Sequence, residues 1–364
     1  MARYPQQPVK ILDPWDGDVL NRHDGQESDA GLSIEVSGEA PPGEEVSVNG
    51  VVADRDGAGF RATVTLTAPD NTIEARAASG ADRITALYDR RSYKRYRYSV
   101  DDNILFLRDI ARDKPQSIFD HWYLAFWREM HESYGAKIHL NIYYQTAGFI
   151  LPELEDRWRE EWAANADWLH LSFHALQNDP SRIYRNATAD RIARDWELVM
   201  AEIHRFATPA VTGDTTTVHW AELTREAVAA LYERGIRKLI GIPHFNPDGS
   251  PRTSYHLDKP HVNHLRGREA WRDPDTGMTF IACDEVVNTT ALDQVPVVLD
   301  EQAANPHTGD MIELLMHEQH FHNNWYGYQP QIQDKVRAAL DWVSEHDYEP
   351  CFWCEGFLGN TKGW

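Results

Sequence analysis

The sequence is poor in cysteine and lacks long apolar segments. Its 364 residues include three cysteines, Cys283, Cys351 and Cys354, too few for a disulfide framework and consistent with reduced thiols in a cytoplasmic protein. Cys351 and Cys354 have the spacing of a redox or zinc motif, but no second pair completes a zinc site, so we expect packed thiols. No apolar run approaches the roughly 20 residues that a membrane helix needs. The first residues also lack the apolar segment of a secretory signal.

Basic side chains are scarce as well. Lys and Arg number 36 against 57 Asp and Glu, which gives a formal net charge of −21. Because nucleic acids and anionic membranes bind to basic faces, we expect neither as a partner. Two residue types are unusually frequent: the chain has 17 His and 13 Trp. Histidine is the commonest metal ligand, and exposed aromatic rings often hold sugars.

Two kinds of pattern divide the chain. Between residues 8 and 85, apolar and polar residues alternate in four short segments, and turn residues such as Asn49-Gly50 separate them. This pattern predicts half-buried strands joined by hairpins. It looks like the immunoglobulin-like modules of carbohydrate-active proteins, and we expect a small all-β sandwich over residues 8–85.

From residue 90 to 364, short apolar segments alternate with amphipathic stretches. The predicted strands are Arg97–Val100, Lys137–Tyr144, Trp168–Phe173, Lys238–Ile242, Thr279–Ile281, Met311–Met316 and Glu349–Trp353. The clearest predicted helices are Pro152–Ala164, Ala189–Phe206, Thr224–Arg234 and Pro330–Glu345. Repeated strand–helix units indicate an α/β domain with a mostly parallel sheet, either doubly wound or closed into a barrel.

Candidate catalytic residues follow the predicted strands, because parallel-sheet proteins gather functional groups at the carboxyl ends of their strands. Asp101 and Asp102 follow the first strand of this domain. A metal would offset the repulsion between adjacent carboxylates, although Asp also begins helices as an N-cap. His170 and His174 are four residues apart, and a helical turn or a tight bend after a strand would let both ligate one metal.

Other strand ends and loops add histidines and aromatic residues. His219 follows Thr215–Val218 and can be a third ligand, an acid–base group or a packed side chain. His317 follows a late strand, whereas we expect His320 and His322 on the surface. Four residues in loops and near strand ends are expected to contact a substrate: Trp220, Glu222, His244 and Trp325.

Taken in chain order, these strand ends resemble the polysaccharide deacetylase family, also called the NodB-homology or family-4 carbohydrate esterase family. The matching residues are Asp101-Asp102, His170 with His174, and Leu315-Met316-His317 before the predicted helix Pro330–Glu345. The resemblance covers about residues 95–357. It implies that residues 90–364 form a deformed (β/α) barrel of about seven strands.

The resemblance also implies roles for individual residues. Asp102, His170 and His174 would bind a divalent metal, usually zinc. Asp101 would be the general base toward water, and His317 the general acid for the leaving group. These roles agree with general chemistry, since a metal lowers the pKa of water and polarises a carbonyl, and a positioned carboxylate and imidazole can move the protons.

The most serious departure from the family pattern lies in one segment. Thr217-Val218-His219-Trp220 stands where the family has Arg-x-Pro-Tyr, so the ligand set Asp102, His174 and His219 stays open beside the first. The sequence predicts a metal-dependent hydrolase of carbohydrates, in the first place a deacetylase of N- or O-acetylated sugars. Two alternatives are a glycan-binding protein without catalysis and a barrel enzyme that cleaves glycosidic bonds.

Overall fold

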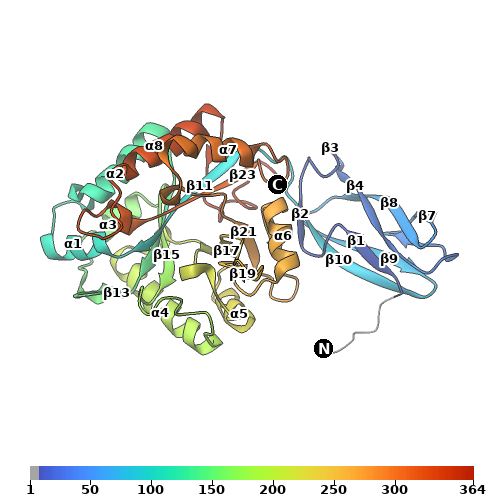
Figure 1. The fold of residues 1–364 in the computed structure, drawn as a ribbon, viewed down its shortest axis with the longest axis horizontal. Helices are drawn as coiled ribbons and strands as arrows, with labels where there is room; N and C mark the ends of the chain where they lie inside the picture. Colours follow the sequence, from blue (N-terminus) through green and yellow to red (C-terminus); the bar gives the residue numbers. More distant parts are fainter. Residues whose placement is uncertain (1–7) are drawn as a thin grey trace. The chain divides into compact units, whose positions relative to one another are not determined.

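The computed structural model describes residues 8–364, and the chain divides into two compact units (Figure 1). The first unit contains residues up to Tyr93 together with 270–277 and 356–364, and the second contains Lys94–Glu269 and Met278–Glu355. The predicted domains, 8–85 and 90–364, were consecutive in the chain. The prediction therefore did not assign the segments 270–277 and 356–364 to the first unit. Within the first unit, the Trp271 indole donates to the Asp16 carbonyl oxygen at 2.8 Å, a contact that local sequence pattern does not encode.

The first unit consists of two sheets. One has the order β1 (Lys10–Asp13), β4 (Gly31–Glu39), β8 (Gly59–Leu66) and β7 (Asp54–Asp56), with β3 (Gln26–Ser28) paired to β4. The other contains β20 (Ala270–Arg272), β2 (Asp18–Leu20), β10 (Gly80–Tyr88), β9 (Asp70–Ala77), β5 (Ser47–Val48) and β6 (Val51–Val52). Every second residue of β8 is buried, as alternation predicts. The buried residues, including Ile34, Val64 and Ile73, form one apolar core.

The second unit has mixed α/β structure with parallel strands. One sheet has the order β15 (Leu169–Ala175), β12 (Ile138–Tyr143), β11 (Arg95–Asn103), β23 (Met311–His317) and β22 (Glu285–Val286), and β24 (Glu349–Pro350) pairs with β11. A second parallel ladder joins β16 (Thr215–Thr216), β17 (Lys238–Gly241) and β21 (Thr279–Ala282). The α/β prediction for residues beyond 90 is confirmed. Between β15 and β16 the Thr216 hydroxyl donates to the Phe173 carbonyl, and closure into a barrel stays a prediction.

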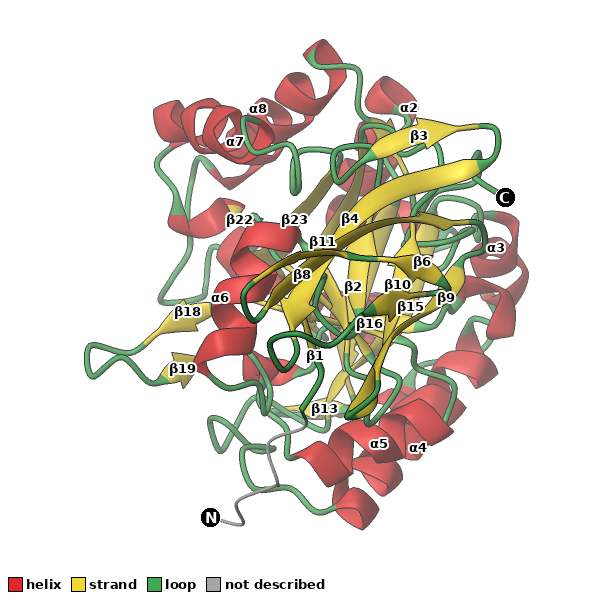
Figure 2. Cartoon of the chain, turned by 90° about the vertical axis from the view of Figure 1, so that its right-hand side faces the viewer, coloured by secondary structure: helices red, strands yellow, loops and turns green. Residues whose placement is uncertain are grey.

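Helices lie on both sides of these strands. In Figures 1 and 2, α2 (Trp122–Tyr134), α7 (Val295–Ala303) and α8 (Ile332–Glu345) lie on one side, and α4 (Ala189–Phe206) and α5 (Arg225–Glu233) lie on the opposite side. The remaining helices are α1 (Leu105–Asp113), α3 (Arg159–Ala164) and α6 (Lys259–Arg268). Two hairpins pair β13 (Gln145–Thr146) with β14 (Phe149–Ile150), and β18 (His244–Phe245) with β19 (Pro251–Arg252).

Several predicted elements agree closely with the observed ones. Helix α4 has the predicted bounds, and the Thr188 side chain caps it by accepting from the Arg191 backbone N–H. The predicted helix Pro152–Ala164 is instead the short α3, preceded by a separate turn at Leu151–Glu153. The three thiols are unpaired, and Cys351 is buried, as expected for packed cysteines. Across residues 8–364, each helix is too short or too polar to span a bilayer.

Paired polar side chains occupy the face of the parallel sheet below the strand ends. Arg97 and Glu313 are completely buried and form an ion pair at 2.5 Å. The Glu313 carboxylate also accepts from the Ser99 hydroxyl at 2.7 Å and from the Trp353 indole at 2.7 Å. Burying a charge is costly unless it is paired and hydrogen-bonded. These contacts therefore stabilise buried polar side chains along β11, the strand that also carries Asp101.

Candidate metal centre

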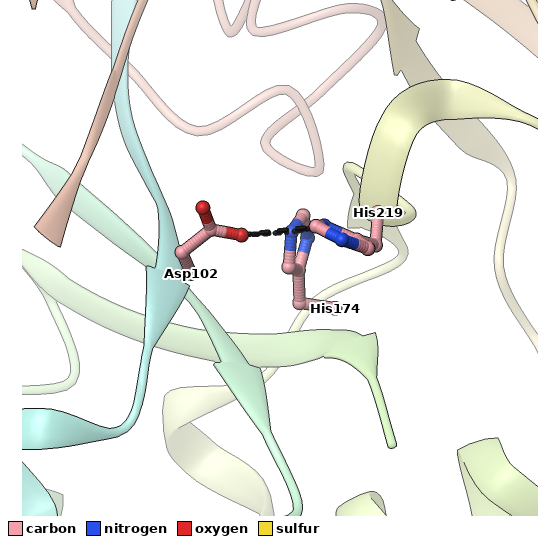
Figure 3. A group of neighbouring side chains, drawn as sticks. All are labelled: Asp102, His174 and His219. Atoms are coloured by element: carbon pink, nitrogen blue, oxygen red, sulfur yellow. Dashed lines mark hydrogen bonds and ion pairs between the residues drawn. The ribbon is translucent and has the colours of Figure 1, made fainter. Parts of the chain in front are cut away.

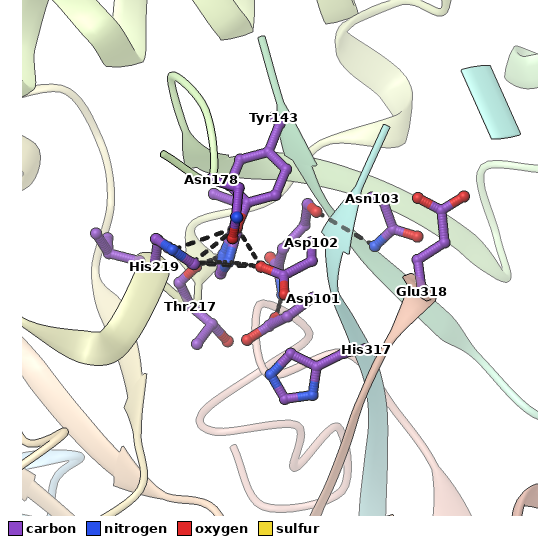
Figure 4. A network of polar contacts seen from close by, with 12 residues as sticks. Asp101, Asp102, Asn103, Tyr143, Asn178, Thr217, His219, His317 and Glu318 are labelled. Atoms are coloured by element: carbon purple, nitrogen blue, oxygen red, sulfur yellow. Dashed lines mark hydrogen bonds and ion pairs between the residues drawn. The ribbon is translucent and has the colours of Figure 1, made fainter. Parts of the chain in front are cut away.

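An irregularity at the end of β11 brings its two adjacent carboxylates together. Neighbouring residues of a regular strand point to opposite faces. Here the pairing of β11 with β12 shifts register between Val100 and Asn103, and Asp102 has a left-handed φ of 63°. Asp101 stays in register with His317 on β23. Bulges of this kind re-aim side chains, and Figure 4 shows Asp101, Asp102 and His317 near one another.

A second irregularity positions His174. The pairing of β12 with β15 passes from Ile142 opposite Phe173 to Tyr143 opposite Ala175, which leaves His174 as the extra residue. Its Nδ1 lies 2.5 Å from the Thr217 carbonyl oxygen. Because a carbonyl only accepts, Nδ1 carries the proton, and Nε2 is the nitrogen that faces Asp102. Metal-bound histidines are commonly oriented by such a bond on their other nitrogen.

Asp102, His174 and His219 form a compact set of metal-ligand atoms (Figure 3). Asp102 Oδ1 lies 3.0 Å from His174 Nε2 and 3.3 Å from His219 Nδ1, and the two nitrogens are 3.2 Å apart. Zinc–ligand bonds of about 2.0–2.2 Å in tetrahedral geometry place ligand atoms roughly 3.3–3.6 Å apart. The observed triangle is only slightly tighter. Two imidazoles and a carboxylate therefore fit a divalent metal ion.

His219 is held by unusual backbone and by a tyrosine. It begins a short turn, His219–Ala221, in which Trp220 and Ala221 have φ angles of 64° and 46°. Non-glycine residues rarely adopt this left-handed region, and such outliers gather at functional sites. The Tyr143 hydroxyl lies 2.8 Å from His219 Nδ1 and also donates to Asp102. Tyr143 ends β12 and was not among the predicted site residues.

His170 is not part of this set of ligand atoms. Both His170 and His174 lie within β15, and four residues of extended strand span about 13 Å. The predicted pairing of the two as ligands of one metal required a helical turn or a bend, which the strand does not make. The His170 ring instead stacks on Phe352 at 3.6 Å between centroids. Burial lowers the pKa of His170 to about 4.

Burial and neighbouring charges shift the pKa values of Asp101, Asp102 and His174. Burial raises the pKa of Asp101 to about 6, although His174 opposes this shift. Burial would also raise the pKa of Asp102, but hydrogen bonds from His174 and His219 hold it well below its usual value. For His174, burial lowers the pKa, and the carboxylates of Asp101 and Asp102 outweigh it to give a raised value. The same negative charge of Asp101 and Asp102 that raises the pKa of His174 would also favour a bound cation.

His317 lies next to the metal-ligand set at the end of β23. Its Nδ1 is 2.9 Å from Asn288 Oδ1, which assigns the proton to Nδ1 and leaves Nε2 to exchange protons. Burial lowers the pKa of His317, and the negative charge of Asp102 acts against this shift. The predicted acid is thus at the predicted strand end.

A cleft of about 440 Å³ opens beside Asp102. Its polar lining is rich in amide side chains, and Trp325 and Tyr143 supply aromatic rings. The Gln319 amide in this lining also donates to Asp102 Oδ2 at 2.8 Å. Other lining residues are Ile104, Leu105, Gln145, Thr146, Ala147, Gln177, Asn178 and Asp179. Among the predicted substrate contacts, Trp325 is the one placed in this cleft.

The other three predicted substrate contacts lie outside the lining of this cleft. Trp220 faces the Arg182 guanidinium, whose central carbon is 4.4 Å from the ring centroid. The Glu222 carboxylate accepts from Arg185 at 2.9 Å and from Arg182, and this pairing occupies its charge. His244 is an exposed residue of the β18–β19 hairpin. Trp220, Glu222 and His244 were chosen because they follow predicted strands. That position did not predict which of them would line the cleft.

The segment after His317 is more buried than predicted. His322, expected on the surface, is 5% exposed, and its Nε2 lies 3.0 Å from Glu318 Oε1. The Glu318 carboxylate also accepts from three backbone N–H groups at the start of α1, those of Ile104, Leu105 and Phe106, at 2.7, 2.9 and 2.6 Å. Glu318 thereby joins the end of β23 to the segment that follows Asp101 and Asp102. Sequence carried no signal for this contact across more than 200 residues.

The sequence matches no protein-family model and no curated protein. Matching solved structures include BA3943, a family-4 carbohydrate esterase pseudoenzyme from Bacillus anthracis, with 11% identity over 72% of this chain and 64% of that one and a TM-score of 0.32. Agd3, a carbohydrate deacetylase, has 9% identity over 88% and 64% and a TM-score of 0.40. A structure from Bordetella bronchiseptica, named for polysaccharide deacetylation in O-antigen biosynthesis, has 14% identity over 74% and 87% and a TM-score of 0.34. The chain spans 64% of the length of the first two.

Proposed function

We propose that this chain is a metal-dependent hydrolase that removes acetyl groups from an acetylated carbohydrate. The observation that carries the proposal is the triangle of Asp102 Oδ1, His174 Nε2 and His219 Nδ1, with sides of 3.0–3.3 Å, beside an amide-lined cleft. We assign the metal to these three residues and favour zinc, since imidazole and carboxylate ligands with an open position are typical of catalytic zinc sites.

The bound metal would supply Lewis acidity, lowering the pKa of a water molecule and polarising the acetyl carbonyl. Asp101 is adjacent to the ligands without being one of them, so its carboxylate can accept the proton of the attacking water. His317 Nε2, with Nδ1 fixed by Asn288, can give a proton to the leaving oxygen or nitrogen. Asp101 and His317 are strand partners, and this proximity supports their proposed roles as base and acid of one reaction.

The cleft suits a sugar. Amide side chains both donate and accept hydrogen bonds, as sugar hydroxyls do, and four of them line this space: Gln145, Gln177, Asn178 and Gln319. Trp325 adds an indole ring that can pack on the apolar C–H face of a pyranose. This combination of amide side chains and an indole ring supports a carbohydrate substrate.

The test measures acetate release by the zinc-loaded full chain from N-acetylated and O-acetylated hexose oligomers. We expect acetate without new reducing ends. Asp101→Asn and His317→Asn should each lower kcat by about 10²–10⁴, with Glu345→Gln, an exposed position on α8, as the unchanged control. New reducing ends without acetate would favour a glycosidic-bond-cleaving enzyme, and sugar binding without turnover would favour a glycan-binding protein.

A further inference from the structure

We propose that Asn141 is a positioning residue that holds the Asp101 carboxylate in place as the base, and that the Ser172 hydroxyl fixes the orientation of the Asn141 amide. This inference rests on the proposed function. It concerns three residues from three neighbouring strands, β11, β12 and β15.

The first reason is the set of contacts. Asn141 Nδ2 donates to Asp101 Oδ1 at 2.6 Å, and Ser172 Oγ donates to Asn141 Oδ1 at 2.5 Å. All three side chains are buried, with 0%, 4% and 1% exposure for Asn141, Asp101 and Ser172. Buried hydrogen bonds with a charged acceptor are the strong ones, so this chain of contacts is well placed to fix a carboxylate.

The direction of the two hydrogen bonds also supports this inference. An ionised carboxylate only accepts, so the amide nitrogen of Asn141 must face Asp101. The opposite end of the amide is then its oxygen, and the hydroxyl of Ser172 satisfies it. Thr216 lies nearby, with its Oγ1 3.3 Å from Asn141 Oδ1, but its proton goes to the Phe173 carbonyl. Ser172 is therefore the donor that keeps the amide from turning over.

Without Asn141, the Asp101 carboxylate would be free to change its orientation. Within residues 8–364, Asn141 is the side chain that the structure shows hydrogen-bonded to the Asp101 carboxylate. Asp101 is adjacent to Asp102, a proposed ligand, and a carboxylate released from Asn141 could turn toward the metal. A carboxylate bound to the metal would no longer accept a proton from water. Anchoring Oδ1 keeps Oδ2 available as the base.

The experiment compares four variants of the zinc-loaded full chain: Asn141→Ala, Asn141→Asp, Ser172→Ala and Ser172→Thr. Acetate release from the best hexose oligomer, or from 4-nitrophenyl acetate as a probe, gives kcat and KM. Loss of a hydrogen bond to a charged group predicts a 10- to 100-fold lower kcat in Asn141→Ala. KM should stay within threefold, and the zinc content should stay at one per chain. Asn141→Asp, which sets a second carboxylate against Asp101, should lose more.

The two substitutions of Ser172 distinguish an effect on the position of the base from an effect on folding. Ser172→Ala should lower kcat with little change in the midpoint of thermal unfolding, and Ser172→Thr, which keeps the hydroxyl, should restore it. Asn186→Ala, at an exposed position, is the control. Normal kcat in Asn141→Ala with intact zinc would overturn the inference, as would equal rates for Ser172→Ala and Ser172→Thr. Failure of the proposed function looks different, because the unmodified chain and Asp101→Asn would then release acetate equally, or not at all.

Discussion

Removing the charge of Glu318 should destabilise the second unit strongly, although Glu318 lies far from α1 in the sequence. Helix α1 has no side-chain cap of its own at Ile104 and no acidic residue in its first turn. Glu318 supplies the missing acceptor from the end of β23, to three backbone N–H groups and to His322. A negative charge at this helix end is also stabilised by the helix dipole.

The substitution Glu318→Gln keeps the shape of the side chain and replaces one acceptor by an NH₂ group. At least one backbone N–H then loses its charged partner in a buried position. A hydrogen bond to a charged group contributes about 1.5–3 kcal/mol, and the weaker helix-end interaction adds about 0.3–1 kcal/mol. We therefore expect the free energy of unfolding to fall by about 2–4 kcal/mol, a large part of the 5–15 kcal/mol typical of a folded domain.

Urea denaturation followed by tryptophan fluorescence measures this change, with Glu345→Gln as the matched control. Glu345 is exposed near the end of α8, and its substitution should alter stability by less than about 0.5 kcal/mol. A Glu318→Gln protein as stable as the control would refute the view that Glu318 is the cap of α1.

Three further predictions concern other residues. Tyr143→Phe should weaken zinc binding by about 10–100-fold, because it removes the hydroxyl that donates to the Asp102 carboxylate and orients it; isothermal titration with zinc measures this, and unchanged affinity would contradict it. Trp325→Ala should raise KM for hexose oligomers without lowering zinc content, whereas an unchanged KM would remove Trp325 from the substrate site. Burial raises the pKa of Asp284 to about 8, so the folded chain keeps a proton that the unfolded chain releases near pH 4. Stability from this group is present at low pH and is lost as pH rises toward 8. Asp284→Asn should flatten that decline in urea midpoints between pH 4 and 8, and an unaltered slope would refute it.

Local pattern predicted the elements whose burial repeats regularly. The apolar spacing of α4 defined its bounds because Thr188 caps one end and one face is buried. The strand ends at Asp101, His174 and His317 were also found, since functional groups collect where parallel strands finish. These predictions needed only residue types and periodicity.

The contacts that complete the site depend on backbone geometry that residue types do not reveal. The left-handed φ of Asp102 and the bulge at His174 decide which side chains converge. His170 looked like a ligand because its spacing from His174 is right for a helix, whereas the strand carries it away. Tyr143 and Glu318 had no motif, and only their positions at the ends of β12 and β23 could have indicated them.

The assignment of the metal ligands can be tested by the zinc content of four purified proteins: the unmodified chain, His219→Asn, His174→Asn and His170→Gln. We expect one zinc per chain in the unmodified protein and in His170→Gln, and loss of zinc in the other two variants. If His170→Gln loses zinc while His219→Asn keeps it, the metal is not held by Asp102, His174 and His219.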